Sequence, residues 1–420
     1  MRLTYPMKYI LIIGDGMADH PLKELGGKTP LQVAQHPSMD FIASHGLCGR
    51  LNTLHQELDT GTDVAIMSIL GYDPRKFYTG RGPLEAAGIG AKLNENDIAF
   101  RCNLITEKNG ILIDYSAGHI GTKDAKELLK IIKDAYEKLG EIEFFLGVSY
   151  RHLLVLRGIK YSNRIMCTQP HEALDKPILE ILPKEVDEKG TKTARTLKKI
   201  IMASKDLLSD HPINKKRIEK GINPANMIWP WGQGMKPKFQ PLYDVYDIKG
   251  AVISAVDIVN GIGAFAGMDV IRVPGATGYH DTNYEGKADY ALESLKDYDF
   301  VLIHVEAPDE ASHMGDYNLK IKTIEDLDKR LIGRVLNGLK GDYTIAILPD
   351  HATLTELRIH TRDPVPFAIF SNSQTEGDKV EHFDEVSVKE GSLGLIEGVN
   401  FMSLFLGRSK SIKGVSLRGV

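Results

Sequence analysis

Cysteine is scarce in this sequence of 420 residues. The three cysteines, Cys48, Cys102 and Cys167, lie far apart and form no Cys-x-x-Cys pair. This excludes a disulfide framework and predicts buried thiols in a reducing compartment. The N-terminal segment lacks a signal-peptide core, and the first apolar run, from Tyr9 to Ile13, is far shorter than a membrane span. We therefore expect a soluble, cytoplasmic protein.

An excess of positive charge is also missing. The formal net charge is −4, from 52 Lys and Arg against 56 Asp and Glu, so nothing indicates a nucleic-acid or anionic-membrane partner. Hydrophobic residues make up 42% and charged residues 26%, which excludes a disordered chain. The length suits two domains. The expected partner is a small molecule, and the sequence does not predict an oligomeric state.

Short, continuous apolar runs near both ends of the chain predict strands buried on both faces, as in a parallel sheet. They cover residues 8–14, 299–305 and 343–348, and a further strand is expected at 366–370. Apolar and charged residues over 317–339 follow helical spacing. Strands that alternate with helices predict an α/β sheet.

The middle of the chain has a different pattern. Residues 99–105 and 111–115 predict a hairpin with an Asn-Gly turn, residues 144–156 predict one or two strands, and 123–139 and 193–208 predict helices. The stretch 209–247 is rich in Pro, Gly, Asn and Trp and is expected to form loops. We therefore predict an α/β domain of residues 1–77 and 246–420, interrupted by an α+β domain of residues 78–245.

Two glycine motifs do not indicate nucleotide binding. Gly26-Gly-Lys-Thr29 lacks the earlier glycine of a phosphate-binding loop, because Leu22 stands there, and it lies too far from a strand. Gly261-Ile-Gly263 follows a helix-like run over 254–260 and is expected to end that helix.

Acidic residues follow three of the expected strands. Ligands of open α/β sheets bind outside the carboxyl ends of the strands, so Asp15, Asp309 and Asp350 are expected to converge on one crevice. Carboxylates and imidazoles are the usual ligands of zinc, manganese and similar ions. The candidate ligands are Asp15, Asp309, His313, Asp350, His351 and His360. These are more ligands than one catalytic ion needs, so they favour a site with two ions. Sites of that type are suited to phosphoryl chemistry.

A nucleophile is expected at Thr62. The segment Asp59-Thr-Gly-Thr-Asp63 precedes an apolar run, which places a hydroxyl at a helix N-terminus, where backbone N–H groups favour an anion. A threonine hydroxyl needs a metal or a base to activate it. The alternative is a plain helix cap formed by Thr60 or Thr62.

With these residues identified, the chain resembles the cofactor-independent phosphoglycerate mutases, specifically their archaeal-type branch, within the alkaline phosphatase superfamily. The resemblance runs nearly end to end. The motifs that carry it include Ile13-Gly-Asp-Gly-Met-Ala-Asp19, Gly61-Thr-Asp-Val-Ala65, Tyr78-Thr-Gly-Arg-Gly-Pro83, Gly147-Val-Ser-Tyr-Arg-His152, Pro274-Gly-Ala-Thr-Gly-Tyr279, Glu306-Ala-Pro-Asp-Glu-Ala-Ser-His313 and Pro349-Asp-His351. It implies an alkaline-phosphatase-like three-layer α/β/α domain with a smaller α+β domain inserted.

The resemblance also implies interconversion of 3-phosphoglycerate and 2-phosphoglycerate in glycolysis and gluconeogenesis, without 2,3-bisphosphoglycerate. It implies two divalent ions, often manganese, with magnesium, cobalt or zinc as alternatives. One ion is then held by Asp309, His313 and His360, and the other by Asp15, Asp350, His351 and Thr62. The mutases use a serine nucleophile, so the phosphothreonine expected at Thr62 is a departure whose extra methyl restricts χ1.

The inserted domain is expected to bind the substrate and to act as a lid. Arg151 is the first candidate for the carboxylate or phosphate, because guanidinium groups match both. His119 is the next, as a group that positions the glycerate or transfers a proton, and Arg81, His171 and Arg217 follow. Two other functions stay open: a phosphotransferase of the same fold with another acceptor, such as homoserine, and a metal-dependent phosphatase.

Overall fold

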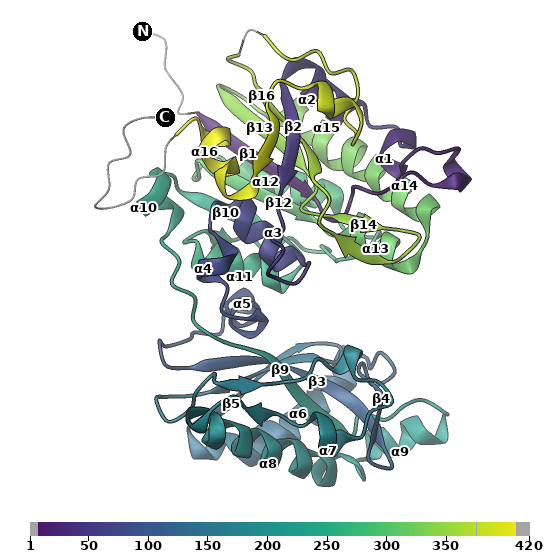
Figure 1. Ribbon diagram of the computed structural model, residues 1–420, viewed down its shortest axis with the longest axis vertical. Coiled ribbons are helices and arrows are strands. Elements are labelled where there is room, and N and C mark those ends of the chain that lie inside the picture. Colours follow the sequence, from purple (N-terminus) through teal and green to yellow (C-terminus); the bar gives the residue numbers. More distant parts are fainter. Residues whose placement is uncertain (1–6, 375, 409–420) are drawn as a thin grey trace. The chain divides into compact units, whose positions relative to one another are not determined.

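The structure is a computed structural model that describes residues 7–374 and 376–408. The chain forms two compact units, Met1–Tyr78 with Lys238–Val420 and Thr79–Pro237. The first unit is built from both ends of the chain and the second from its middle (Figure 1). Metal binding is expected for the first unit and substrate binding for the second. None of the described helices is long and apolar enough to cross a membrane.

An eight-stranded sheet forms the centre of the first unit. Its strands lie in the order β11 (Asp269–Val270), β10 (Gly250–Ile253), β12 (Phe300–Val305), β1 (Lys8–Gly14), β13 (Tyr343–Leu348), β16 (Val365–Ser371), β2 (Leu47–Asn52) and β17 (Gly394–Glu397). β16 runs antiparallel to both of its neighbours, and every other pair of neighbouring strands in this sheet is parallel. The apolar runs therefore predicted β1, β12, β13 and β16, and the α/β fold class is confirmed.

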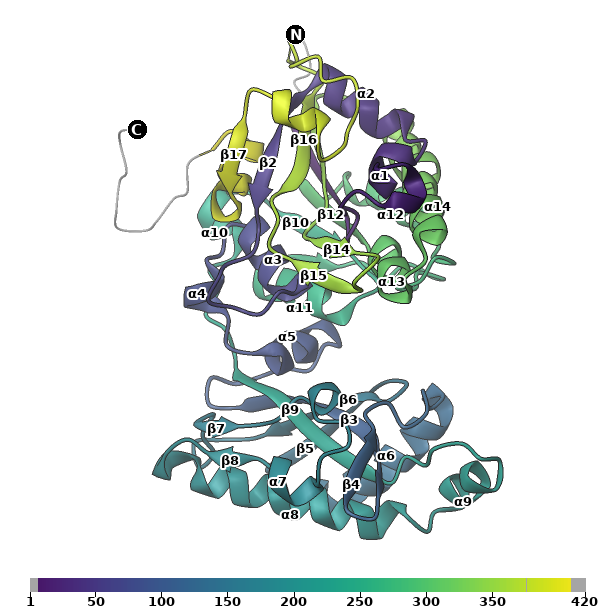
Figure 2. The same ribbon diagram turned by 45° about the vertical axis from the view of Figure 1, so that its right-hand side comes forward.

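Helices cover both faces of this sheet (Figures 1 and 2). Ile10 and Ile12 of β1 pack into one core with residues of α2 (Pro37–His45), α12 (Tyr284–Ser294) and α14 (Tyr317–Asp326). Tyr9 points to the opposite face, where its ring lies 5.7 Å from that of Phe405 in α16 (Phe401–Leu406). Burial on both faces explains why these strands are continuously apolar.

Two helical segments of the first unit differ from the expectation. Gly261 and Gly263 do not end a helix, because α11 (Asp257–Phe265) continues through both. Gly263 instead allows close packing, since a Cβ there would lie 2.6 Å from Cγ1 of Val252 in β10. The pattern over 317–339 forms α14, a π-helical segment (Leu327–Ile332) and α15 (Gly333–Gly338).

A five-stranded antiparallel sheet forms the second unit. It contains β3 (Ile98–Lys108), β4 (Ile111–Asp114), β5 (Ile142–Val148), β6 (Arg151–Leu156) and β9 (Met227–Met235), and β3 pairs with β4, β6 and β9. The Asn-Gly hairpin is confirmed, with Asn109 at φ 53° and Gly110 at φ 82° between β3 and β4. α6 (Thr122–Tyr136) and α8 (Thr191–Leu208) cover one face of the sheet.

The expectation of loops over 209–247 is wrong. This stretch contains α9 (Pro212–Glu219), β9 and α10 (Leu242–Tyr246). Pro230 lies in the middle of β9, where a proline usually argues against a strand. It is tolerated because β9 pairs with β3 alone among the described strands and therefore forms an edge.

Candidate metal centre

The carboxyl ends of β12, β1 and β13 meet at one edge of the large sheet. Asp15 directly follows β1, and Asp350 follows β13. Asp309 lies in the first turn of α13 (Ala307–Met314), which begins just after β12. These three carboxylate side chains are buried. The parallel order of the strands thus brings together residues that are far apart in the sequence.

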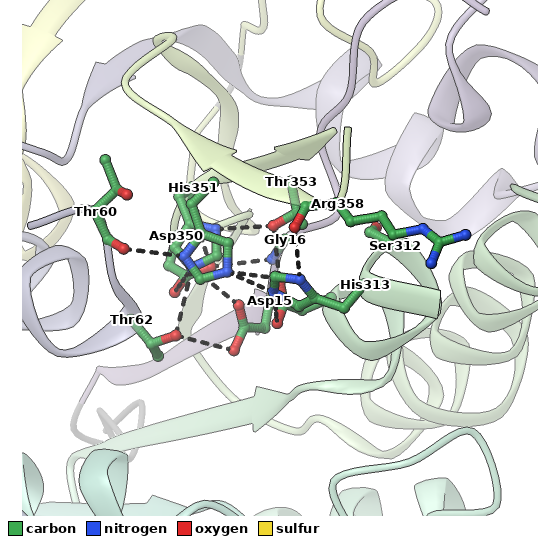
Figure 3. A network of polar contacts seen from close by, with 12 residues as sticks. Asp15, Gly16, Thr60, Thr62, Ser312, His313, Asp350, His351, Thr353 and Arg358 are labelled. Carbon is green, nitrogen blue, oxygen red and sulfur yellow. Dashed lines mark hydrogen bonds and ion pairs between the residues drawn. The ribbon is translucent and has the colours of Figure 1, made fainter. Parts of the chain in front are cut away.

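Three histidines lie against these carboxylates (Figure 3). His313 comes from α13, and His360 from β15 (Ile359–Thr361), which forms a hairpin with β14 (Ala352–Leu354) (Figure 2). The Nε2 atoms of His313 and His360 are 3.3 and 3.4 Å from Asp309 oxygens and 2.8 Å from each other. His351 Nε2 lies 3.4 Å from Asp15 Oδ1 and 3.4 Å from Asp350 Oδ2.

The Nδ1 atom of each histidine already has a hydrogen-bond partner. His313 Nδ1 lies 3.1 Å from the carbonyl oxygen of Arg358, and His360 Nδ1 lies 3.1 Å from that of Thr60. A carbonyl accepts hydrogen bonds, so Nδ1 carries a proton in both rings and Nε2 is the ring nitrogen that faces the Asp309 carboxylate. His351 Nδ1 lies 3.1 Å from the hydroxyl of Thr353.

Thr62 is the first residue of α3 (Thr62–Ile69). Its Oγ1 lies 3.4 Å from Asp15 Oδ2 and 3.4 Å from His351 Nε2. The residue in the cap position is Gly61, which makes no side-chain cap hydrogen bond. The alternative in which Thr60 or Thr62 serves as an ordinary helix cap is therefore wrong, and the hydroxyl of Thr62 faces the carboxylate and histidine cluster.

The electrostatics of the cluster are strongly perturbed. Burial, together with the nearby charges of Asp350 and Asp309, raises the pKa of Asp15 well above its usual value. Burial acts in the same direction on Asp309, but hydrogen bonds from His313 and His360 outweigh it and hold the pKa of Asp309 well below the usual value. Burial lowers the pKa of His351, so this imidazole is neutral near pH 7. Perturbed groups of this kind cluster at functional sites.

The donor set fits divalent cations. Asp15 Oδ1 and Asp350 Oδ2 are buried and accept no hydrogen bond from the described residues. Buried polar atoms normally have a partner, and a bound cation would supply one for both oxygens. Three sets of side chains have ligand atoms within 4.8 Å of one another: Asp309, His351 and His360; Asp15, Asp350 and His351; and Asp15, Glu306 and Asp309. Carboxylate oxygens and imidazole nitrogens in such sets suit manganese, zinc and related ions.

Sequence reasoning missed three residues of this region. Thr353 donates from Oγ1 to Asp309 Oδ1 at 2.6 Å, and Glu306 belongs to one of the three sets. His304 is fully buried, with Nε2 3.1 Å from Asp15 Oδ2, and burial lowers its pKa to about 4. The available signal for His304 was a single histidine at the end of the apolar strand β12.

The substrate candidates of the second unit gather around aromatic rings. The guanidinium of Arg151 lies 5.3 Å from the Tyr150 ring, and His119 lies 6.2 Å from the same ring. His171 contacts Tyr115 and Trp231. The sequence did not indicate Arg101, whose guanidinium lies over the Trp231 ring. Arg101 and Arg81 both form ion pairs with Glu85. We call Arg81, Arg101, Arg151, His119 and His171 the arginine–histidine cluster.

Comparison with known proteins gives concordant matches. A family model described as 2,3-bisphosphoglycerate-independent phosphoglycerate mutase matches residues 43–214. The protein of that name from Methanosarcina barkeri is 50% identical over 403 residues, which cover 95% of this chain and 99% of the relative. A 2,3-bisphosphoglycerate-independent phosphoglycerate mutase 1 from Methanocaldococcus jannaschii is 41% identical over 401 residues, with 95% and 96% coverage.

Two solved structures also match over nearly the whole chain. A protein from Pyrococcus horikoshii has a TM-score of 0.82 and 31% identity, with coverage of 97% of this chain and 100% of that one. A cofactor-independent phosphoglycerate mutase from Thermoplasma acidophilum has a TM-score of 0.67 and 30% identity, with coverage of 96% and 99%.

Proposed function

Because this chain belongs to the family of 2,3-bisphosphoglycerate-independent phosphoglycerate mutases, we propose that it interconverts 3-phosphoglycerate and 2-phosphoglycerate through a phosphothreonine at Thr62. It is an isomerase of glycolysis and, in the reverse direction, of gluconeogenesis. The observation that carries the phosphothreonine proposal is the position of the Thr62 hydroxyl, at the start of α3 and 3.4 Å from both Asp15 and His351.

Two divalent ions, with manganese as the first candidate, are part of the proposal. The residues that would hold one ion are Asp309, His313 and His360, and those that would hold the other are Asp15, Asp350, His351 and Thr62. When bound, such ions supply positive charge for phosphoryl oxygens and lower the pKa of a coordinated hydroxyl.

The free cysteines are consistent with the cytoplasmic location, which we retain as a proposal.

Thr62 Oγ1 attacks the phosphorus of 3-phosphoglycerate in the proposed first step. The bond between Oγ1 and phosphorus forms, the bond from phosphorus to O3 of glycerate breaks, and the hydroxyl proton of Thr62 is transferred to O3. Backbone N–H groups at the start of α3 favour the phosphoryl anion. In the second step O2 of the same glycerate attacks the phosphorus, the bond from phosphorus to Oγ1 breaks, and the O2 proton passes to Oγ1 and restores the Thr62 hydroxyl. Glycerate must stay bound between the steps, since water would otherwise hydrolyse the intermediate.

The second unit is proposed to bind the glycerate carboxylate and hydroxyls. The arginine–histidine cluster supports this role, because its guanidinium groups can form paired hydrogen bonds with carboxylate and phosphate. Arg151 remains the first candidate for direct contact, with Arg81 and His171 beside it and His119 as the group that orients glycerate or moves a proton. Arg101 joins these candidates from the structure, since it lies on β3 opposite the strand that carries Arg151.

Phosphorus NMR of the purified protein with 3-phosphoglycerate and manganese tests the proposal, with neither 2,3-bisphosphoglycerate nor nucleotide present. A 2-phosphoglycerate signal is expected. Thr62→Ala should reduce the rate at which 2-phosphoglycerate forms at least about a thousandfold. Thr62→Ser retains a hydroxyl and should keep activity. Thr60→Ala is the matched control, because His360 contacts the Thr60 carbonyl oxygen, which the substitution preserves.

Other products would identify other functions. Release of inorganic phosphate without 2-phosphoglycerate would establish a phosphatase. Turnover that requires ATP and an alcohol acceptor such as homoserine would establish the phosphotransferase. Either result overturns the mutase proposal, and full activity of Thr62→Ala overturns the phosphothreonine.

A further inference from the structure

The second unit contains a strained loop. Ala117, Gly118 and His119 have consecutive left-handed backbone conformations, with φ of 49°, 61° and 48°. Such conformations are unfavourable for residues with a Cβ, and they persist where surrounding contacts over-determine the backbone. The His119 side chain is exposed, so burial of its imidazole does not compensate for the strain.

Asp114 holds this loop from within. Its Oδ1 accepts hydrogen bonds from the backbone N–H of Ser116 at 2.8 Å and from the Ser116 hydroxyl at 2.7 Å. Its Oδ2 accepts from the backbone N–H of Gly118 at 2.6 Å and from Asn223 Nδ2 at 2.9 Å. One carboxylate therefore fixes the backbone on both sides of Ala117.

Arg217 holds the same loop from α9. Its Nη2 donates to the carbonyl oxygen of Ala117 at 2.6 Å, and its Nε donates to that of Asn223 at 2.9 Å. Both hydrogen bonds go to backbone oxygens. They favour a role in positioning the loop over the direct substrate contact that the sequence suggested for Arg217.

A second left-handed turn is tied to this loop. Ser149 has φ 54°, and its hydroxyl donates to the carbonyl oxygen of Ile120 at 2.7 Å. Tyr150 and Arg151 follow directly. The His119 ring lies 6.2 Å from the Tyr150 ring, over which the Arg151 guanidinium lies at 5.3 Å. The strained backbone thus places the His119 imidazole beside the first candidate for substrate contact.

We propose that Asp114 and Arg217 are positioning residues that hold His119 beside Tyr150 and Arg151 so that its imidazole meets the glycerate. This inference rests on the mutase function proposed above. Asp114 and Arg217 act through His119, because their hydrogen bonds end on the loop that carries it. Strain retained at an exposed, ionisable side chain is typical of functional sites.

A double-mutant cycle tests the proposal by mutase kinetics. His119→Ala should lower kcat about a hundredfold, and Asp114→Asn and Arg217→Ala should each lower it about tenfold or more through misplacement of the imidazole. In the His119→Ala background, Asp114→Asn should change kcat less than about twofold. Asp187→Asn and Arg164→Ala are matched controls, because this pair bonds elsewhere in the same unit.

The cycle separates positioning from general stability. If Asp114→Asn costs the same factor in both backgrounds, it acts independently of His119 and the proposal is overturned. Full activity of His119→Ala overturns it as well. A loss that vanishes in the His119→Ala background supports it.

NMR of the His119 ring gives a readout that does not depend on turnover. Asp114→Asn should shift the ring resonances of His119, and Asp187→Asn should leave them in place. Unshifted resonances overturn the proposal even if activity falls. If the wild-type protein does not convert 3-phosphoglycerate, the proposed function fails, and the NMR result alone decides whether Asp114 fixes His119.

Discussion

Removal of the Lys320 ammonium should destabilise the first unit strongly. Lys320 lies in α14 and is fully buried. Its Nζ donates to Asp19 Oδ2 at 2.9 Å, to the carbonyl oxygen of Ala18 at 3.1 Å and to that of Thr353 at 2.8 Å. These bonds join the segment after β1 to β14, and Thr353 in turn contacts Asp309 and His351.

The magnitude follows from burial. Lys320→Met leaves the Asp19 carboxylate buried without its cation, which costs about 3–5 kcal/mol in comparable pairs. Asp19 keeps the hydrogen bond from the Thr355 hydroxyl at 2.6 Å, so we expect the lower half of that range. Lys322→Met in the same helix is the control, because Lys322 forms an exposed pair with Asp326 worth about 0.3–0.5 kcal/mol.

Urea unfolding can follow the two units separately. Both tryptophans of the chain, Trp229 and Trp231, lie in β9 of the second unit, so their fluorescence reports that unit, whereas circular dichroism reports both. Lys320→Met should lower the midpoint of the dichroism transition assigned to the first unit and leave the fluorescence midpoint in place. Equal midpoints for Lys320→Met and Lys322→Met would refute the reasoning.

Three further predictions concern pH, backbone conformation and metal. Burial lowers the pKa of His152 to about 3 from 6.5, so its contribution to stability is complete above pH 6.5 and falls progressively as the pH drops to about 3. The full difference is at most roughly 5 kcal/mol; unfolding of the second unit measured against pH should show this slope, and His152→Asn should remove it. Arg358 has φ 61°, so Arg358→Val should destabilise the first unit by about 1–2 kcal/mol and Arg358→Asn by much less, as measured by thermal unfolding; equal losses would contradict this. Chelation of divalent ions should lower the melting temperature of the wild type and much less that of Asp309→Asn, which calorimetry can compare.

The strand ends of the first unit could be predicted because the signal there is local. Each of β1, β12 and β13 is a continuous apolar run followed by a carboxylate, and the rule that ligands bind at carboxyl ends of parallel strands joins Asp15, Asp309 and Asp350 without further information. The helical spacing between Asp309 and His313 is also local.

The remaining features depend on contacts between distant segments. Pro230 made β9 resemble a loop, and its place at a sheet edge is set by pairing with β3. Likewise, Thr353 and His304 gain their positions from neighbours far away in the sequence. The roles of Asp114 and Arg217 depend on φ angles at residues 117 and 119, which no composition or spacing indicates.

The central claim is that Thr62 carries the phosphoryl group between two oxygens of one glycerate. Mass spectrometry of protein quenched in acid within the first turnovers, after mixing with 3-phosphoglycerate and manganese, tests it most directly. We expect one added phosphoryl group on the peptide that contains Thr62, absent from Thr62→Ala and present in Thr60→Ala. Rapid conversion to 2-phosphoglycerate with no phosphoryl group on Thr62, or with the group on another residue, would contradict it.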